Sequence, residues 1–252
     1  AAPEEPEFSV IDLPGLNPDY ATLRRTVERY RPRLREVLRE RHGIELLAVY
    51  TYPAQVLYCK TPFTGLGDLR GRRIRTSSVA QSEMMTALGA VPIVLPFAEI
   101  VRSVNEDAVD CAVTGTLSGN EIGLADITSY VHALAISWGL SIFGANQDAW
   151  NAIPADLQDV LRRSIQDLEG ETWKRGEQDT RNGLACNSGA ASCEGTPKSM
   201  TLVPASSDDE ALRRRVLEEV ILPRWVQRCG KTCADVWNTL LHEEAGLRAY
   251  AK

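Results

Sequence analysis

The sequence predicts an α/β fold in which one long helix connects two lobes. From about residue 44 onward, short apolar runs typical of buried strands alternate with helical segments, the order that builds a sheet with parallel crossovers. A helical pattern that starts at Pro154 and reaches about Leu184 would be about 45 Å long, which is more than one small domain needs. A chain of 252 residues with 44% apolar content can form one large domain or two smaller ones.

The first predicted elements are two consecutive helices rich in arginine. Apolar residues recur at helical spacing on both sides of Pro32, and Gly43 is placed as a C-terminal stop. Arginines crowd residues 24–41, but glutamates interleave with them and the net charge of the chain is −6. These helices are therefore expected to present a solvated face, and no nucleic-acid partner is predicted.

The middle of the chain supplies the strands and short helices of the predicted sheet. Ser78 can cap a helix that ends near Leu88, and Pro96 can open a helix that ends near Asn105. The apolar runs that we assign to strands lie at residues 46–50, 55–59, 91–95 and 109–114, followed by an extended run over 134–145. Helices and strands at this spacing favour a sheet with parallel crossovers.

The last part of the chain is predicted to be a loop followed by helices. Residues 187–197 are rich in Gly, Ser and Ala and indicate a surface loop, and residues 208–250 are mainly helical with interruptions at Pro223 and Gly230. The longest apolar stretches in the chain fall short of the roughly 18 to 20 residues that a membrane-spanning helix needs. The protein is therefore not expected to be inserted in a membrane.

Six cysteines indicate disulfides and an oxidising compartment. A zinc site is disfavoured because the spacings lack CxxC knuckles and the three histidines are scattered, and no metal or other cofactor is predicted. About 15 pairings are possible. Closure of the sequence-local pairs favours one set: Cys186 with Cys193, Cys229 with Cys233, and Cys59 with Cys111. The second pair is the weakest, because a regular helix through it would not readily give disulfide geometry.

No set of catalytic residues can be assembled from the sequence, so an enzyme is not predicted. Residues 114–120 combine glycines with small hydroxyl residues and could present backbone amides to an anion, although an ordinary strand-to-helix turn fits equally well. The segment from Asp68 to Arg75 ends a turn and enters a further predicted strand. Ligands of an α/β sheet collect at the carboxyl ends of its strands, and an arginine placed there could pair with a carboxylate. From the residue alone, a surface ion pair is the favoured alternative.

Four motifs appear in a fixed order along the chain. They are Asp68-Leu-Arg-Gly-Arg-Arg-Ile-Arg75, Ala87-Leu-Gly-Ala-Val-Pro-Ile-Val-Leu-Pro-Phe-Ala-Glu99, Ala108-Val-Asp-Cys-Ala-Val-Thr-Gly115 and Trp150-Asn-Ala-Ile-Pro-Ala-Asp-Leu157. In this order and spacing the sequence resembles the solute-binding proteins of tripartite ATP-independent periplasmic (TRAP) transporters over about Phe8 to Gly183.

This resemblance implies a two-lobe, periplasmic-binding-protein-like α/β fold with a long inter-lobe helix. Lobe I would comprise residues 1–51 and 140–178, and lobe II residues 52–139 and 179–252. The implied function is capture of an organic acid through its carboxylate and its delivery to TRAP membrane permease subunits, by a monomer without enzymatic activity. The alternative is a ligand-sensing or protein-interaction module that takes no part in transport.

The resemblance also implies a periplasmic location. The first residues, Ala1 to Glu5, have neither the basic end nor the apolar region of a secretory signal, so such a segment is expected to have been removed already. In the family, an opening βαβ region precedes the segment that resembles Val10 to Pro14 and builds one wall of the cleft. Because this chain begins almost at that segment, lobe I is expected to be incomplete.

Eight residues are candidates for the ligand site, and the family's motifs directly imply Arg75, Phe97, Ser78 and Thr114. Arg75 falls on the arginine that pairs with the ligand carboxylate, and Thr114 falls where the family has a pocket-facing asparagine. The other candidates are Phe97, Ser78, Gly115, Gln55, Tyr52 and Trp138. For Phe97, Tyr52 and Trp138 the alternative is structural packing. The aromatic residues favour a monocarboxylate with an apolar or aromatic body.

Overall fold

The computed structural model describes residues 5–251. The expectation about a removed signal, and the start of the lobe predicted over 1–51, fall partly on residues outside that range.

The strands are β1 Ile44–Thr51, β2 Gln55–Cys59, β3 Arg73–Thr76, β4 Val91–Val94, β5 Cys111–Gly115, β6 Tyr130–His132, β7 Leu140–Asn146 and β8 Thr201–Val203. The α-helices are α1 Tyr20–His42, α2 Val79–Ala87, α3 Ile100–Asn105, α4 Thr116–Glu121, α5 Gln147–Asn151, α6 Ala155–Ser188, α7 Ser207–Val216, α8 Leu222–Cys229, α9 Lys231–Leu240 and α10 His242–Ala245. Shorter turns are η1 Pro6–Asp12, η2 Leu66–Leu69, η3 Phe97–Glu99 and η4 Leu124–Asp126, which are 3₁₀, and the π-helical η5 Leu217–Ile221.

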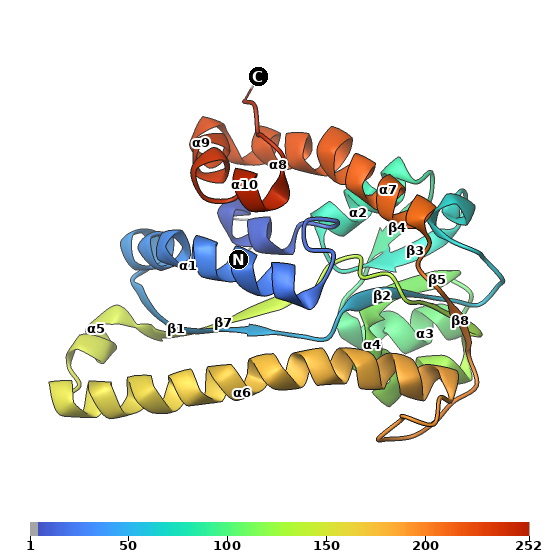
Figure 1. Ribbon diagram of the computed structural model, residues 1–252, viewed down its shortest axis with the longest axis horizontal. Coiled ribbons are helices and arrows are strands. Elements are labelled where there is room, and N and C mark those ends of the chain that lie inside the picture. The colour runs from blue at the N-terminus through green and yellow to red at the C-terminus, as the bar shows by residue number, and fades with distance from the viewer. Residues whose placement is uncertain (1–4, 252) are drawn as a thin grey trace.

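The strands form two separate sheets (Figure 1). One contains only β1 and β7, paired antiparallel, and α1 and α6 pack against β1. The other has six strands in the order β4-β3-β5-β2-β6-β8. Because β3 is parallel to both β4 and β5, the carboxyl ends of these three strands meet at one edge of the larger sheet.

The larger sheet contains the predicted parallel pairs, β3 with β4 and β3 with β5, but the sheet as a whole is mixed. Strand β2 runs antiparallel to both of its neighbours, β5 and β6. The direction of β2 follows from that of β1, because only residues 52–54 separate the two strands and the chain passes almost straight from one sheet into the other (Figure 1). The amino end of β2 therefore lies beside the carboxyl end of β5.

Helix α1 is continuous, whereas two helices separated at Pro32 were predicted. A proline inside a helix removes one backbone hydrogen bond and crowds the preceding turn. In α1 the apolar stripe continues on both sides of Pro32, and Tyr30 and Leu34 are both buried in the core. Packing of this uninterrupted face outweighs the lost hydrogen bond, so the helix continues to the predicted stop at Gly43, which has φ of 61°.

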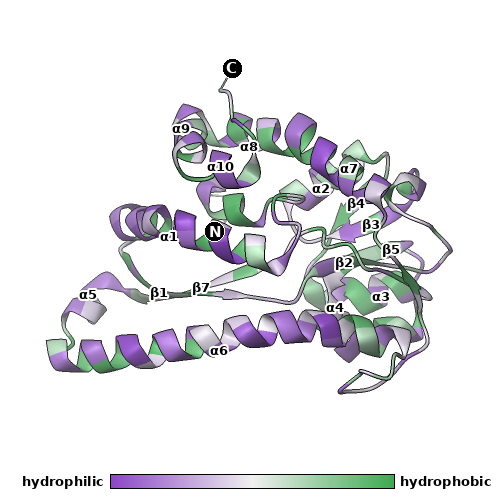
Figure 2. Cartoon of the chain, in the orientation of Figure 1, coloured by the Kyte–Doolittle hydropathy of each residue, from purple (hydrophilic) through white to green (hydrophobic). Residues whose placement is uncertain are grey.

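Helix α6 has 34 residues and, at about 1.5 Å per residue, is about 50 Å long. It runs beside β1 and ends against α4 of the larger sheet, as the length prediction required (Figure 1). The apolar side chains of this helix are only partly buried: Trp173 is in the core, whereas Leu157, Val160 and Leu168 are half-exposed. Figure 2 shows polar and apolar residues alternating along the helix.

The C-terminal helices are less interrupted than predicted. The chain stays helical through Pro223, because the π-helical turn η5 comes immediately before it and includes Glu219, the residue whose carbonyl a proline ring would crowd. The predicted break at Gly230 is confirmed, with φ of 84° between α8 and α9. These helices pack on η1, α1 and α2.

All six cysteines are paired, in the set that local closure favoured. The bridges are Cys59–Cys111, Cys186–Cys193 and Cys229–Cys233. The first joins β2 to β5, the second ties the loop after α6 to the last turns of that helix, and the third spans the break at Gly230. Within residues 5–251 no helix is long and apolar enough to cross a membrane.

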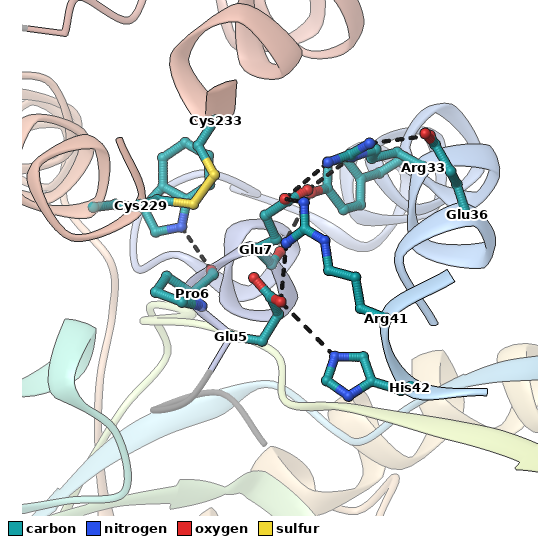
Figure 3. A network of polar contacts seen from close by, with 11 residues as sticks. Glu5, Pro6, Glu7, Arg33, Glu36, Arg41, His42, Cys229 and Cys233 are labelled. Atoms are coloured by element: carbon teal, nitrogen blue, oxygen red, sulfur yellow. Dashed lines mark hydrogen bonds and ion pairs between the residues drawn. A yellow bond between two sulfur atoms is a disulfide. The ribbon is translucent and has the colours of Figure 1, made fainter. Parts of the chain in front are cut away.

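A buried acidic residue fastens the N-terminal segment to the rest of the molecule (Figure 3). Glu7 is 2% exposed, and its two carboxylate oxygens accept hydrogen bonds from Nε and Nη2 of Arg33 at 2.8 and 2.9 Å. Arg41 pairs with the same carboxylate at 3.0 Å. Next to it, the indole of Trp225 in α8 donates to the Pro6 carbonyl at 2.8 Å. The first described residues are thus held by α1 and by the C-terminal helices together.

Candidate ligand-binding site

Arg75 is a buried cation at the carboxyl end of β3. It is 3% exposed, and its Nε and Nη1 donate to the carbonyls of Leu95 at 2.9 Å and Val113 at 2.7 Å. No carboxylate of residues 5–251 lies within ion-pair distance of it. Burial lowers the pKa of the guanidinium to about 10. Arg75 therefore does not form the surface ion pair that was the alternative from the sequence.

The guanidinium of Arg75 retains hydrogen-bonding capacity. A guanidinium carries five N–H groups, and the two carbonyls engage one on Nε and one on Nη1. The second N–H of Nη1 and both of Nη2 make no hydrogen bond within the described part of the chain. A carboxylate can accept two parallel hydrogen bonds from this end of an arginine, and its charge would compensate the buried cation.

Thr114 and Phe97 lie on the two segments that hold Arg75. Arg75 pairs with Ala112 in β5, so Thr114, two residues further, is on the same face of the sheet and one step closer to its edge. Thr114 is 2% exposed. Phe97 follows the Leu95 carbonyl by two residues and is 51% exposed, so it is a surface aromatic and not a core residue.

Ser78 has a structural task at the same edge of the sheet. Its hydroxyl caps α2 by accepting a hydrogen bond from the backbone N–H of Gln81 at 3.2 Å. The predicted helix cap is therefore confirmed, and any ligand contact of this hydroxyl would come in addition to it.

A second group of predicted residues lies around the Gln55 amide, where the amino end of β2 meets the carboxyl end of β5. Gln55 is paired with Gly115, and a Cβ placed on Gly115 would be 3.3 Å from Gln55 Nε2. A Cβ on Gly139 would be 3.6 Å from the same nitrogen and 3.7 Å from the Cβ of Tyr52. Tyr52, Gln55 and Gly115 are therefore neighbours, and Tyr52 is 53% exposed.

Trp138 is a core residue in this structure. It is 4% exposed, its indole N–H donates to the Asn17 carbonyl at 2.9 Å, and Tyr20 packs edge-on against its ring. Beside it, the buried carboxylate of Asp12 accepts the backbone N–H groups of Trp138 and Gly139, both at 2.8 Å, and burial raises its pKa. This contact fixes the backbone that passes Gln55.

A cavity of about 1000 Å³ opens between β1, β7 and α6. Of the predicted site residues, only Tyr52 lines it. Its other walls mix acidic and basic side chains, among them Glu171, Lys174 and Arg175. Tyr52 thus stands where the Gln55 group adjoins this cavity, whereas Arg75 lies outside it.

Ser118, which the residue-by-residue prediction missed, belongs to the Gln55 group. Its Oγ would be 3.2 Å from a Cβ on Gly115, and the residue is half-buried in the first turn of α4. The sequence pattern that could have identified Ser118 is the run of small hydroxyl residues and glycines over 114–120, which includes it. No cluster of residues suited to holding a metal ion occurs within residues 5–251.

Comparison with known proteins identifies the family. Residues 1–203 match the family model described as bacterial extracellular solute-binding protein, family 7. Among curated proteins, the chain is 27% identical over 163 residues to the C4-dicarboxylate-binding periplasmic protein DctP of Rhodobacter capsulatus, covering 63% of this chain and 48% of that protein. It is 25% identical over 122 residues to the ectoine-binding periplasmic protein TeaA of Halomonas elongata, covering 48% of this chain and 36% of that protein. The chain thus spans about half the length, or less, of the curated relatives that it matches.

Solved structures share the fold over nearly the whole chain. DctP7 of Bordetella pertussis, an extracytoplasmic solute receptor binding pyroglutamic acid, superposes with a TM-score of 0.80 at 21% identity, covering 95% of this chain and 76% of that one. A TRAP periplasmic solute-binding protein of Desulfovibrio salexigens with bound orotic acid gives a TM-score of 0.84 at 18% identity, covering 97% and 76%. These matches confirm the predicted periplasmic-binding-protein-like α/β fold with its long helix α6.

The family is one of solute receptors and not of enzymes, as the sequence predicted. The match to its model over residues 1–203 and the shared fold agree with the ordered motifs that suggested TRAP receptors. The chain belongs to bacterial extracellular solute-binding protein family 7, the solute-binding proteins of TRAP transporters.

Proposed function

We propose that this protein is a periplasmic receptor that captures an organic acid through its carboxylate and delivers it to a TRAP membrane permease. The observation that carries the proposal is the buried cation of Arg75, which has free N–H groups and no acidic partner among the described residues. Structurally similar proteins support an organic acid as the ligand: one binds pyroglutamic acid, another was solved with bound orotic acid, and a third, from Rhodoferax ferrireducens, with bound malonate.

Capture would involve the two lobes predicted from the sequence. The β1–β7 sheet falls in lobe I (residues 1–51 and 140–178) and the six-stranded sheet in lobe II (residues 52–139 and 179–252). Three connections join them: residues 52–54, the backbone at Gly139, and α6. Closure about these connections would exclude water from a carboxylate at Arg75, which strengthens the charge-assisted pair.

The proposal is tested by isothermal titration of the purified protein with pyroglutamate, orotate and malonate. We expect at least one to bind to the wild type, and Arg75→Ala to weaken that binding by at least about 30-fold, because a hydrogen bond to a charged group contributes about 1.5–3 kcal/mol and loss of one partner costs more. Arg75→Lys keeps the charge and loses the fork geometry, so it should bind with intermediate affinity.

Arg73→Ala is the matched control. Arg73 is in the same strand, but it is half-exposed and pairs at 2.6 Å with Asp110, at the opposite end of β5 from Thr114. This variant should bind like the wild type. Equal affinity of Arg75→Ala and wild type, or no binding of any carboxylate by a folded wild type, would refute the assignment.

A further inference from the structure

We propose that Gln81 is a positioning residue for ligand capture, because its buried side chain ties the end of β3 that follows Arg75 to the connection between the two lobes. The tie continues from Gln81 through Ser137 to Asp12. Gln81 would act through Arg75 and through the backbone at Gly139, without touching the ligand itself. The inference rests on the proposed function, since it needs a carboxylate to be captured at Arg75.

The amide oxygen of Gln81 holds the backbone just beyond Arg75. Gln81 is 2% exposed, and its Oε1 accepts hydrogen bonds from the backbone N–H of Ser77 at 2.9 Å and from the Ser77 hydroxyl at 3.0 Å. Ser77 is the second residue after Arg75 and the first after β3. These two bonds fill both acceptor positions of the amide oxygen, so the chain is fixed where it leaves the strand.

The amide nitrogen of Gln81 binds a different part of the chain. Its Nε2 donates to the Ser137 hydroxyl at 3.1 Å, and Ser137 is 3% exposed. The Ser137 carbonyl accepts the backbone N–H of Gln55 at 2.9 Å, which joins this segment to the start of β2. One buried side chain therefore connects the end of β3 with a segment that lies 56 positions later in the sequence.

Asp12 completes the tie on the side of lobe I. Its Oδ1 accepts the backbone N–H groups of Trp138 and Gly139, both at 2.8 Å. Burial raises the pKa of Asp12, and hydrogen bonds from these two N–H groups and from the Ser137 side chain act against it. Asp12 is the last residue of η1, the segment that Glu7 fastens to α1. The tie therefore runs from the end of β3 in lobe II to the N-terminal segment of lobe I.

A helix cap alone does not explain this geometry. Gln81 is the third residue of α2 after the cap residue Ser78, and in a capping box its side chain would accept the backbone N–H of Ser78. Instead it accepts from Ser77, one residue further out, and donates to Ser137. The cap is made separately, by the Ser78 hydroxyl and the N–H of Gln81. Both ends of the Gln81 side chain therefore bind outside the helix.

The tie links Arg75 to the movement that closes the lobes. Closure would turn the lobes about residues 52–54, Gly139 and α6, and the Asp12 carboxylate holds the backbone at Gly139. Because a buried hydrogen bond is costly to leave unmade, the end of β3 and this backbone should move together during closure. Without the tie, Arg75 would still bind a carboxylate, but the bound ligand would favour the closed arrangement less strongly.

Isothermal titration and small-angle X-ray scattering with pyroglutamate, orotate and malonate test this role. Ser137→Ala cuts the tie and leaves both bonds between Gln81 and Ser77 in place. It should weaken binding of the acid that the wild type binds by about 5- to 10-fold. At saturating ligand its radius of gyration should fall by less than that of the wild type, a difference that a mere loss of stability would not produce.

A double-variant comparison tests whether Gln81 and Ser137 act as one unit. Gln81→Leu should weaken binding at least as much as Ser137→Ala does. The double variant should bind no more weakly than Gln81→Leu alone, because both substitutions break the same tie. Additive losses of affinity would show that the two side chains act independently and would contradict the proposal.

Ser82→Ala is the matched control. Ser82 follows Gln81 in α2, and its hydroxyl is 2.8 Å from that of Thr76 in β3 and donates to the Ser78 carbonyl within the helix. This variant should bind and contract like the wild type, and circular dichroism and melting temperature verify that each variant is folded.

The outcomes separate this inference from the proposed function. If Ser137→Ala binds or contracts as the wild type does, or if Ser82→Ala has the same effect as Ser137→Ala, the positioning role is refuted and capture at Arg75 stands. If none of the three acids binds to the folded wild type, the proposed function fails and the positioning role with it.

Discussion

At the scale of single residues, the charged side chains that are buried differ in what compensates them. Glu7 is buried with two arginines in contact, whereas Arg75 is buried against backbone carbonyls only. Burial alone would raise the pKa of Glu7, but its hydrogen bonds and charge interactions with Arg33, and the charge of Arg41, outweigh it and lower that pKa below 4.5. Glu7 and its two arginines stabilise the fold, whereas Arg75 is the residue that we propose binds an external anion.

The lowered pKa of Glu7 predicts a specific dependence of stability on pH. Because the pKa is lower in the folded than in the unfolded protein, the contribution of Glu7 is fully present above about pH 4.5 and is lost as the pH falls through the folded-state value. Glu7→Gln should lower the free energy of unfolding by about 3 kcal/mol at pH 7, because it leaves two arginines without their shared partner, and by less at pH 3.

Urea denaturation at the two pH values measures this effect. Glu36→Gln is the control, since Glu36 pairs with the same Arg33 but is half-exposed, and its loss should cost at most about 1 kcal/mol. A Glu7→Gln variant that is as stable as Glu36→Gln at pH 7 would contradict this account of the N-terminal contact.

At the scale of elements, a glycine near the C-terminal end of α6 brings the backbone of this helix close to that of α4. A Cβ on Gly183 would overlap the backbone of Thr116 and Leu117 in α4, so this glycine allows the two helices to touch. Gly170, in the same helix, has nothing within 4 Å of its Cβ position. The same residue type therefore has opposite significance at the two positions.

Alanine substitutions of these two glycines should have effects of opposite sign. Gly183→Ala should destabilise the protein by about 1–3 kcal/mol or prevent folding, because neither helix can shift without disturbing its packing on the sheet. Gly170→Ala should stabilise it by about 0.5–1 kcal/mol through helix propensity. Thermal melting followed by circular dichroism reports both, and equal melting temperatures would show that α6 and α4 are not in close contact in solution.

At the scale of the whole molecule, the disulfides connect parts of the chain over very different separations. Cys59–Cys111 closes a loop of sequence separation 52 across the centre of the larger sheet, and Cys186–Cys193 closes one of 7. In the chain-entropy model these loops correspond to about 4 and about 2 kcal/mol. The first bridge also joins two paired strands directly, because Cys59 in β2 lies opposite Cys111 in β5.

Removal of the two bridges should therefore lower stability to different extents. The variant Cys59→Ala/Cys111→Ala should lose more of its free energy of unfolding than Cys186→Ala/Cys193→Ala, by roughly 2 kcal/mol on the chain-entropy model. Guanidinium denaturation of the two variants measures the difference. The reverse order would mean that residual structure in the unfolded chain already brings β2 and β5 together.

The sequence by itself determined the elements and the chemistry that the site uses. Apolar spacing located β1, β2, β4 and β5, and local periodicity and capping located the Ser78 cap and α6. Strand β3, which carries Arg75, has no apolar run and was expected only from its place after a turn. The motif around Arg75 indicated the cationic contact. Local closure favoured the cysteine pairing that the structure has, because short loops are easier to close.

Only the tertiary structure decided which of these residues are neighbours and how they are buried. The antiparallel pairing of β2 with β5, the continuity of α1 through Pro32 and the core position of Trp138 all depend on packing between distant segments, which local patterns do not encode. The proximity of Gln55 and Ser118 has the same origin. Gln55 and Ser118 are 63 positions apart in the sequence, and they meet because β2 pairs antiparallel with β5 and because Gly115 leaves no side chain between them.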